Sequence, residues 1–206
     1  KKAMQALGPS AAFFTVDVGK EASCRSMIAA AAAELGRIDI LVNCAGIAIR
    51  KRPEILNDAE WHEVLNVNLT GTFACSQAVY PHLQKQGGGK IINIGSMLSI
   101  FGAAPNAAYA ASKGAVVQFT KSCAVAWAKD NIQVNAILPG WIDTELTVGA
   151  RQQIEGLNER VLARSPTGRW GKPDEFAGIA VFLASEASAF VTGTAIPVDG
   201  GYSVMV

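Results

Sequence analysis

Short runs that are apolar throughout alternate along this chain with longer helical segments, and this alternation limits the possible folds most strongly. The expected strands are residues 11–16, 38–42, 90–94, 133–138 and 195–198, and the expected helices are residues 21–35, 58–86, 107–129 and 174–184. Strands without a polar face, joined by helices, are typical of a parallel sheet covered on both sides. The sequence therefore predicts an α/β fold with a doubly wound, Rossmann-like parallel sheet in a single domain over residues 1–206.

Composition limits the partners of the chain. Half of its 206 residues are hydrophobic and 17% are charged, against about 25% charged in an average soluble domain. The apolar excess favours a homo-oligomer, and a net charge of +1 gives no general attraction to nucleic acid or to a membrane. Arg50, Lys51 and Arg52 form a basic cluster, for which a solvated loop is favoured over an anion site.

The cysteines and the chain start bear on cellular location. The four cysteines show neither CxxC spacing nor pairing with histidine, so we expect no metal site and no disulfide framework. Reduced thiols in a cytoplasmic protein are the default interpretation. No apolar run approaches the ~18–20 residues that a membrane span requires. The chain opens with Lys1 and Lys2, so we expect the true N-terminus, and any targeting signal, to precede this sequence.

Polar residues that can carry chemistry follow the expected strands. Asp17, residues 43–46, Ser96 and residues 139–144 all lie at or after the carboxyl end of an apolar run. Parallel α/β sheets bind their ligands beyond the carboxyl ends of the strands. The pattern therefore predicts one ligand site at that edge.

Tyr109 and Lys113 stand at i and i+4 of the helix expected over 107–129, hence on one helical face. A free tyrosine has a pKa of about 10, and a nearby cation favours the phenolate. Lowering this pKa by about three units takes about 4 kcal/mol and yields a general acid/base for neutral pH. Ser96 precedes the tyrosine by thirteen residues and lacks the GxSxG context of a nucleophile, so it is the better hydrogen-bond donor.

Ser96, Tyr109 and Lys113 at these spacings resemble the catalytic signature of the classical short-chain dehydrogenase/reductase family. The resemblance runs from about residue 35 to residue 201. Residues 41–46 are similar to the family's NNAG segment, with Cys44 in place of the second Asn. Residues 66–69 are similar to the helical segment whose Asn, here Asn68, joins the catalytic group.

The resemblance implies hydride transfer between a nicotinamide cofactor and an alcohol or carbonyl. Tyr109 would exchange the proton, Ser96 would polarise the carbonyl, Lys113 would hold the cofactor ribose and lower the tyrosine pKa, and the backbone of Asn68 would hold a relay water. NAD is slightly favoured over NADP. The residues implied to contact the cofactor are Asp17, Val18, Asn43, Ala45, Gly46, Tyr109, Lys113, Pro139, Gly140, Ile142 and Thr144.

The family opens with a strand and a glycine-rich GxxxGxG turn, and no segment here matches them. In the usual strand order, two strands separate residues 11–16 from residues 38–42. Their absence would leave an opening of about 14 Å, so we expect the first βαβ portion to be missing and this chain not to fold alone. Three hypotheses remain: a working dehydrogenase that lacks its first ~50 residues in this sequence, a cofactor-less scaffold, and a non-redox relative such as a dehydratase.

The resemblance also bears on substrate and assembly. Residues 141–172 should form a substrate lid, where Trp141, Leu146 and Trp170 would line the substrate site together with Ser96. Residues 96–101 resemble sugar-acid and polyol dehydrogenases more than 3-oxoacyl reductases, and other secondary alcohols are a third possibility. Apolar residues on the helices over 58–86 and 107–129, and the apolar tail 202–206, predict a homotetramer.

Overall fold

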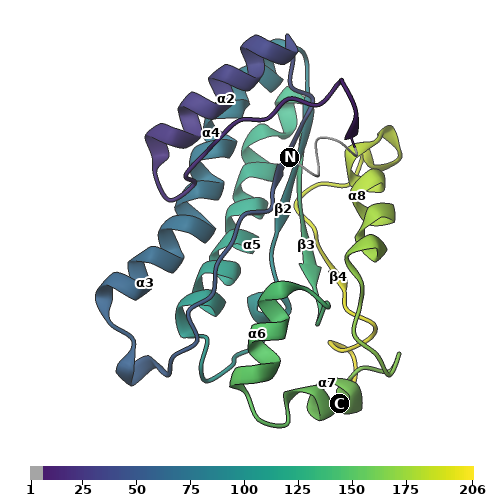
Figure 1. Ribbon diagram of the computed structural model, residues 1–206. Helices are drawn as coiled ribbons and strands as arrows, with labels where there is room; N and C mark the ends of the chain where they lie inside the picture. Colours follow the sequence, from purple (N-terminus) through teal and green to yellow (C-terminus); the bar gives the residue numbers. More distant parts are fainter. Residues whose placement is uncertain (1–6) are drawn as a thin grey trace.

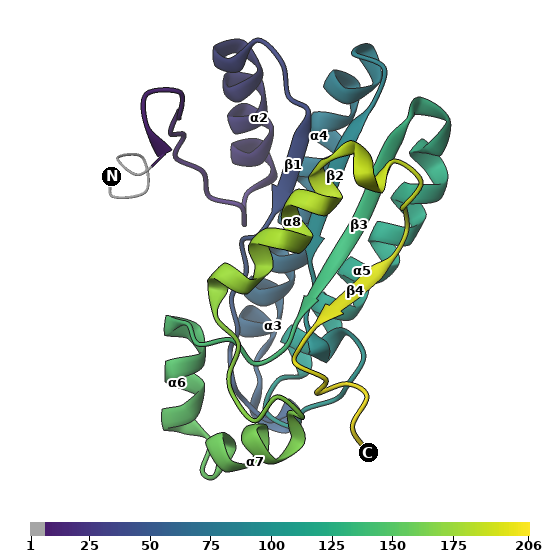
Figure 2. The same ribbon diagram turned by 90° about the vertical axis from the view of Figure 1, so that its right-hand side faces the viewer.

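A computed structural model describes residues 7–206 and contains a parallel sheet with helices on both faces (Figures 1 and 2). The sheet has four strands in the order β1-β2-β3-β4, and every neighbouring pair is parallel. The strands are β1 (Ile40–Asn43), β2 (Gly89–Ile94), β3 (Ile132–Pro139) and β4 (Ala195–Val198). The α/β fold expected from the alternating pattern is confirmed.

Helices cover the two faces of the sheet unequally (Figure 2). The helices are α2 (Glu21–Leu35), α3 (Asp58–Leu65), α4 (Gly71–Lys85), α5 (Ala107–Trp127), α6 (Glu145–Gln153), α7 (Leu157–Arg164) and α8 (Ala177–Ala184). Ile91 of β2 belongs to the core shared with α2, α4 and α5, whereas the next residue, Ile92, packs with Leu183 of α8. Alternate side chains of a strand point to opposite faces, so both faces of the sheet are apolar, as predicted.

The long helix expected over 58–86 is interrupted. It starts at a capping box, in which Asn57 and Glu60 exchange hydrogen bonds, and a π-helical turn over Asn66–Thr70 separates α3 from α4. Such π turns occur frequently at functional sites. Here the turn contains Asn68, one of the predicted catalytic residues.

The expected strand over residues 11–16 is wrong. This segment is extended but pairs with no strand among the described residues, and a strand requires a hydrogen-bonding neighbour. It packs instead on the helices: Phe14 contacts the core beside α2, and Val16 packs against the small cluster around Cys24 and Cys75. The sheet of the described chain therefore ends at β1, where the side chain of Val42 is 50% exposed.

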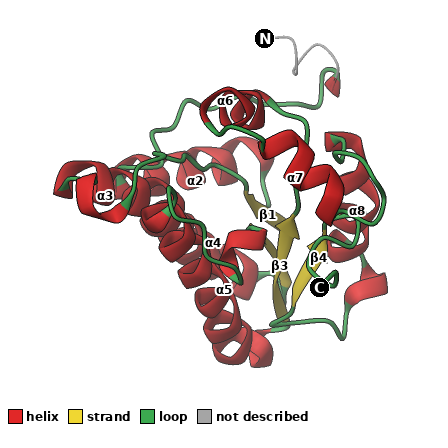
Figure 3. Ribbon diagram, turned by 90° about the horizontal axis from the view of Figure 1, so that it is seen from below, coloured by secondary structure: helices red, strands yellow, loops and turns green. Residues whose placement is uncertain are grey.

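Residues 141–172, the segment expected to form a lid, contain two helices, α6 and α7. Figure 3 shows both helices on the side of the molecule to which the strands lead. The four cysteines are free thiols, and only Cys44 is exposed. Within residues 7–206 no helix is both long and apolar enough to cross a membrane.

Candidate active site

The predicted catalytic residues converge at the carboxyl end of β2. Ser96 follows this strand, and Tyr109 and Lys113 lie on the first turns of α5. Gly95 allows this approach, because a Cβ there would stand 2.3 Å from Cδ2 of Leu138. The Lys113 Nζ donates a hydrogen bond to the carbonyl oxygen of Ile94 at 2.6 Å and lies 5.8 Å from the centroid of the Tyr109 ring.

Burial dominates the electrostatics of this group. It raises the pKa of Tyr109, while a hydrogen bond with Ser96 and the charge of Arg50 act in the opposite direction. Burial also lowers the pKa of Lys113 to about 8, and an electrostatic interaction with Cys44 opposes this shift. The lysine is therefore still mostly protonated at neutral pH. The expected lowering of the tyrosine pKa by Lys113 stays a prediction.

Ser99 connects the strand end to the catalytic helix. Its hydroxyl accepts a hydrogen bond from the backbone N–H of Ser96 at 3.1 Å and donates one to the carbonyl oxygen of Lys113 at 2.8 Å. The Ser96 hydroxyl in turn accepts from the backbone N–H of Leu98 at 3.1 Å. The sequence interpretation missed Ser99. A hydroxyl three residues after Ser96, in a turn that it helps to close, was the available signal.

Asn68 is fully buried, and its side chain positions the loop after β1. Its Oδ1 accepts from the backbone N–H of Ile47 at 2.8 Å, and its Nδ2 donates to the carbonyl oxygen of Ile47 at 3.0 Å and to the Ser112 hydroxyl at 2.9 Å. The backbone carbonyl of Asn68 accepts from the Thr72 hydroxyl at 2.9 Å. The side chain thus links the π turn, the loop and the catalytic helix.

Asn43, a predicted cofactor residue, uses its side chain within the protein. Its Nδ2 donates to the Ser76 hydroxyl at 3.0 Å and to Oδ1 of Asn93 at 2.8 Å. Asn93 continues the chain by donating to the Thr120 hydroxyl on α5 at 2.9 Å. This chain of hydrogen bonds connects β1 and β2 to the helices that pack on them.

A cavity of about 480 Å³ contains most of the predicted cofactor residues. Its polar wall comes from Ser96, Tyr109 and Lys113, and its apolar wall includes Ile92, Ile137 and Phe176. The other predicted residues that line it are Gly46, Pro139, Gly140, Ile142 and Thr144. An apolar cleft with a few convergent polar groups suits a nicotinamide ring and ribose.

Not every predicted cofactor residue joins that cavity. Val18, Asn43 and Ala45 line a neighbouring cavity of about 210 Å³, and Cys44 lines both. Asp17 lines neither cavity: its Oδ1 accepts from the backbone N–H of Gly19 at 3.1 Å, and its carboxylate pairs with Lys20 at 3.2 Å. Gly46 stands close to the catalytic group, because a Cβ there would lie 3.4 Å from Nζ of Lys113.

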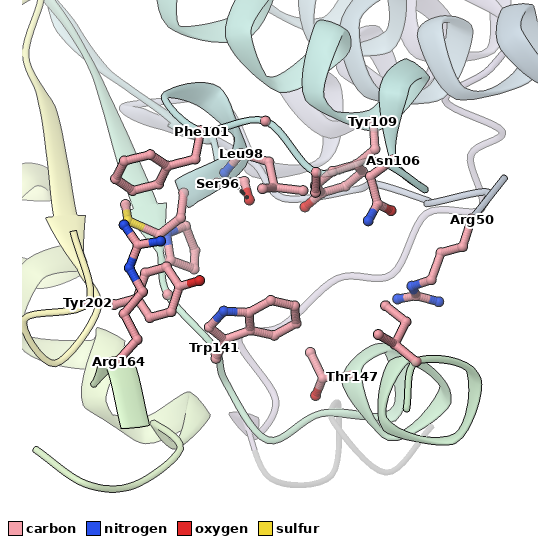
Figure 4. Close-up of a pocket in the computed structure, with 16 residues that line it drawn as sticks. Arg50, Ser96, Leu98, Phe101, Asn106, Tyr109, Trp141, Thr147, Arg164 and Tyr202 are labelled. Atoms are coloured by element: carbon pink, nitrogen blue, oxygen red, sulfur yellow. Dashed lines mark hydrogen bonds between the residues drawn. The ribbon is translucent and has the colours of Figure 1, made fainter. Parts of the chain in front are cut away.

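A second cavity, of about 180 Å³, is lined by Ser96 and Tyr109 as well (Figure 4). Trp141, one of the residues expected at the substrate site, lines this cavity. Trp170 stands behind Trp141 with the ring centroids 5.5 Å apart and does not line the cavity. The side chain of Leu146 lies outside the part of the chain that the structure describes. Residues that sequence reasoning missed here are Arg50, Phe101, Asn106, Thr147, Arg164 and Tyr202.

The three residues of the basic cluster 50–52 have different surroundings. Lys51 pairs with Glu60 and Arg52 pairs with Glu54, which agrees with the expected solvated loop. Arg50 instead lines the second cavity, and its charge acts on Tyr109. In the described chain, no group of three or more His, Cys, Asp or Glu residues is arranged to hold a metal ion.

Comparison with known proteins defines the family. A family model described as enoyl-(acyl carrier protein) reductase matches residues 1–203. The 2-dehydro-3-deoxy-D-gluconate 5-dehydrogenase of Bacillus subtilis is 48% identical over 189 residues, which are 92% of this chain and 74% of that protein. The 3-oxoacyl-(acyl-carrier-protein) reductase of Thermotoga maritima is 44% identical over 166 residues, which are 81% and 66% of the two chains.

Solved structures agree with these relatives. A gluconate 5-dehydrogenase from Burkholderia cenocepacia, crystallised in complex with NADP and tartrate, is 43% identical and superimposes with a TM-score of 0.88 over 92% of this chain and 74% of that one. The chain belongs to the short-chain dehydrogenase/reductase family. It is an NAD(P)-dependent oxidoreductase of that family, acting on CH–OH groups.

Proposed function

We propose that this protein interconverts a secondary hydroxyl and a ketone of a sugar acid with NAD or NADP. The observation that carries this proposal is the position of Ser96 and Tyr109, which line both main cavities. One cavity contains Lys113, and the other contains Arg50 and Arg164. A carbon atom held between Ser96 and Tyr109 would thus lie between a cofactor side and a side with two cations, which suits an anionic substrate.

The chemistry divides among a few side chains. A bound nicotinamide cofactor supplies the hydride acceptor or donor, and Gly46, Lys113, Ile142 and Thr144 would hold it. Tyr109 takes the hydroxyl proton in oxidation and returns it in reduction, and Ser96 donates a hydrogen bond to the substrate oxygen. Lys113, fixed by its bond to the Ile94 carbonyl, keeps a positive charge beside the phenol. Asn68 fixes the loop that borders the cofactor side and, as the family resemblance implies, offers backbone for a relay water.

The comparisons support a sugar acid as the substrate and leave both cofactors in the proposal. The Bacillus subtilis and Burkholderia cenocepacia relatives carry the names of gluconate-type 5-dehydrogenases, and the latter was crystallised with NADP. The segment 141–172 would serve as the lid, with Trp141 against the substrate. The relative from Thermotoga maritima makes a 3-oxoacyl reductase the second candidate.

A spectrophotometric assay tests the function. The full-length protein is incubated with D-gluconate or 2-dehydro-3-deoxy-D-gluconate and either NAD⁺ or NADP⁺, and the absorbance of the reduced nicotinamide is followed. We expect reduction of the cofactor and a ketone product. Efficient reduction of a 3-oxoacyl thioester with no sugar-acid turnover would favour the second candidate. A protein that binds neither cofactor would support the scaffold hypothesis instead.

We also propose a cytoplasmic homotetramer. Apolar side chains remain exposed on the two regions expected to form contacts: Val125 on α5 is 82% exposed, and Val204 in the tail is 80% exposed. Uncovered apolar area of this kind favours association. Light scattering on the full-length protein tests the assembly. A monomer at micromolar concentration would contradict it, and deletion of residues 202–206 should weaken it.

A further inference from the structure

Arg164, the last residue of α7, reaches the second cavity, which lies on the proposed substrate side, from the lid. Its guanidinium carbon lies 5.0 Å from the centroid of the Phe101 ring and 4.6 Å from that of Tyr202. The two rings meet edge to face, with centroids 6.4 Å apart. Three segments that are distant in sequence thus meet around one cation: the lid, the turn after β2 and the chain after β4.

The charge of Arg164 has no counterion within residues 7–206. Two other arginines of the lid are paired, Arg151 with Asp143 and Arg169 with Glu175. A guanidinium that stacks on an aromatic ring keeps its N–H groups directed outward in the plane of the group. Arg164 is therefore fixed in place by two rings while its donors remain available to an acceptor with two oxygens.

The two arginines of this cavity lie at different ends. Arg50 acts electrostatically on Tyr109 and so belongs to the reacting end. In Figure 4, Arg164 lies on the opposite side, beside Phe101 and Tyr202, and the indole of Trp141 lies between the two arginines. A substrate whose carbon atom reacts at Ser96 and Tyr109 would thus extend along Trp141 toward Arg164.

We propose that Arg164 binds the carboxylate of the sugar-acid substrate in a bidentate manner and thereby selects a hydroxyl remote from that carboxylate for reaction. This inference rests on the proposed function and names the residue that makes it specific for an acid. A neutral polyol of the same length fills the same cavity but offers no partner for the guanidinium. Discrimination between acid and polyol is then set by a lid residue, separately from the catalytic group.

The test compares D-gluconate with D-glucitol, in which a CH₂OH group replaces the carboxylate. The KM for gluconate and the inhibition constant of glucitol against gluconate are measured in the wild type and in Arg164→Gln, Arg164→Lys and Arg160→Gln. Arg160 lies one turn earlier on α7 and does not line the cavity, so it is a matched control for charge and for the helix. Glucitol reports on the cavity whether or not it is oxidised.

We expect Arg164→Gln to raise the KM for gluconate by about 10- to 100-fold, as the loss of a charge-assisted pair predicts. Arg164→Lys should be intermediate, because it keeps the charge but loses the planar fork. The glucitol constant should move far less, and Arg160→Gln should change neither value. A gluconate KM within about fivefold of wild type, the most that an exposed ion pair contributes, would overturn the inference. So would equal shifts for gluconate and glucitol. A wild type that oxidises no sugar acid would instead overturn the proposed function.

Discussion

The wall formed by β2 and α5 and the proposed lid over residues 141–172 border the same cavity but are held in place by different interactions. On the wall, Lys113 is 3% exposed, and Asn68 of the π turn, which bonds to Ser112 of α5, is fully buried. Each of the two side chains makes hydrogen bonds to backbone groups. In the lid, Arg151 pairs with the exposed Asp143 and stacks 4.4 Å from the centroid of the Trp170 ring. Buried, fully bonded networks hold a single geometry, whereas exposed ion pairs contribute only about 0–1 kcal/mol.

This difference in support suggests a division of roles, with the wall holding the catalytic geometry and the lid determining substrate affinity. A catalytic geometry must be held within about 0.5 Å, which requires the buried supports of the wall. A substrate lid tolerates looser packing, and its side chains can change with little effect on the fold. We therefore expect variants of the wall to lose turnover or stability, and variants of the lid to change substrate affinity.

Tyr109→Phe gives the largest expected effect on the wall. Only the transferable proton is removed, so turnover should fall by about 10²- to 10⁴-fold while cofactor still binds. Steady-state kinetics and quenching of tryptophan fluorescence by the cofactor measure the two properties separately. A variant that keeps more than half of its activity would show that Tyr109 is not the acid/base.

Asn68→Ala should destabilise the fold by about 2–4 kcal/mol, because both backbone groups of Ile47 lose their partner and the Ser112 hydroxyl loses the hydrogen bond that it accepts. Denaturant unfolding of the full-length protein measures this change. Asn66→Ala is the matched control, since Asn66 lies in the same π turn but is exposed, and it should change stability by less than about 0.5 kcal/mol. Equal losses in the two variants would contradict the bonding role of Asn68.

Lys113→Met tests the burial of the ammonium through the pH dependence of the free energy of unfolding. The folded-state pKa of about 8 lies below the ordinary lysine pKa of 10.5, so the unfolded chain binds more protons between these two pH values. The wild type should therefore gain stability relative to Lys113→Met as pH rises through this window, by about 3 kcal/mol in full. Urea unfolding at several pH values measures the difference. A difference that is constant with pH, or that moves the other way, would contradict this assignment.

The sequence predicted the wall better than the lid, for a physical reason. Tyr109 and Lys113 lie on a regular helix and Ser96 follows a regular strand, so periodicity and chain order determine which side chains share an edge. Arg164 and Tyr202 meet only through packing between distant segments, and no local pattern records that contact. Residues 11–16 show why a local pattern can also predict too much. Their composition suits a strand, but strand formation depends on a pairing neighbour and not on the segment alone.

Trp170→Phe in the lid gives the smallest expected effect. The indole Nε1 donates to Oδ1 of Asn158 at 2.9 Å, while the ring meets Trp141 edge to face and Arg151 lies over it. Phenylalanine keeps an aromatic ring for both contacts and loses the hydrogen bond, so stability should fall by about 0.5–1.5 kcal/mol. Asn158→Ala removes the same hydrogen bond from the other side, and the double variant should lose less stability than the sum of the two single losses.

Because Trp170 supports Trp141 and is absent from the cavity lining, the KM for the sugar acid should rise slightly in Trp170→Phe while kcat is unchanged. Thermal unfolding and steady-state kinetics on the three variants measure these quantities. A fall in kcat larger than the change in KM would place Trp170 with the wall and erase the distinction between the two regions.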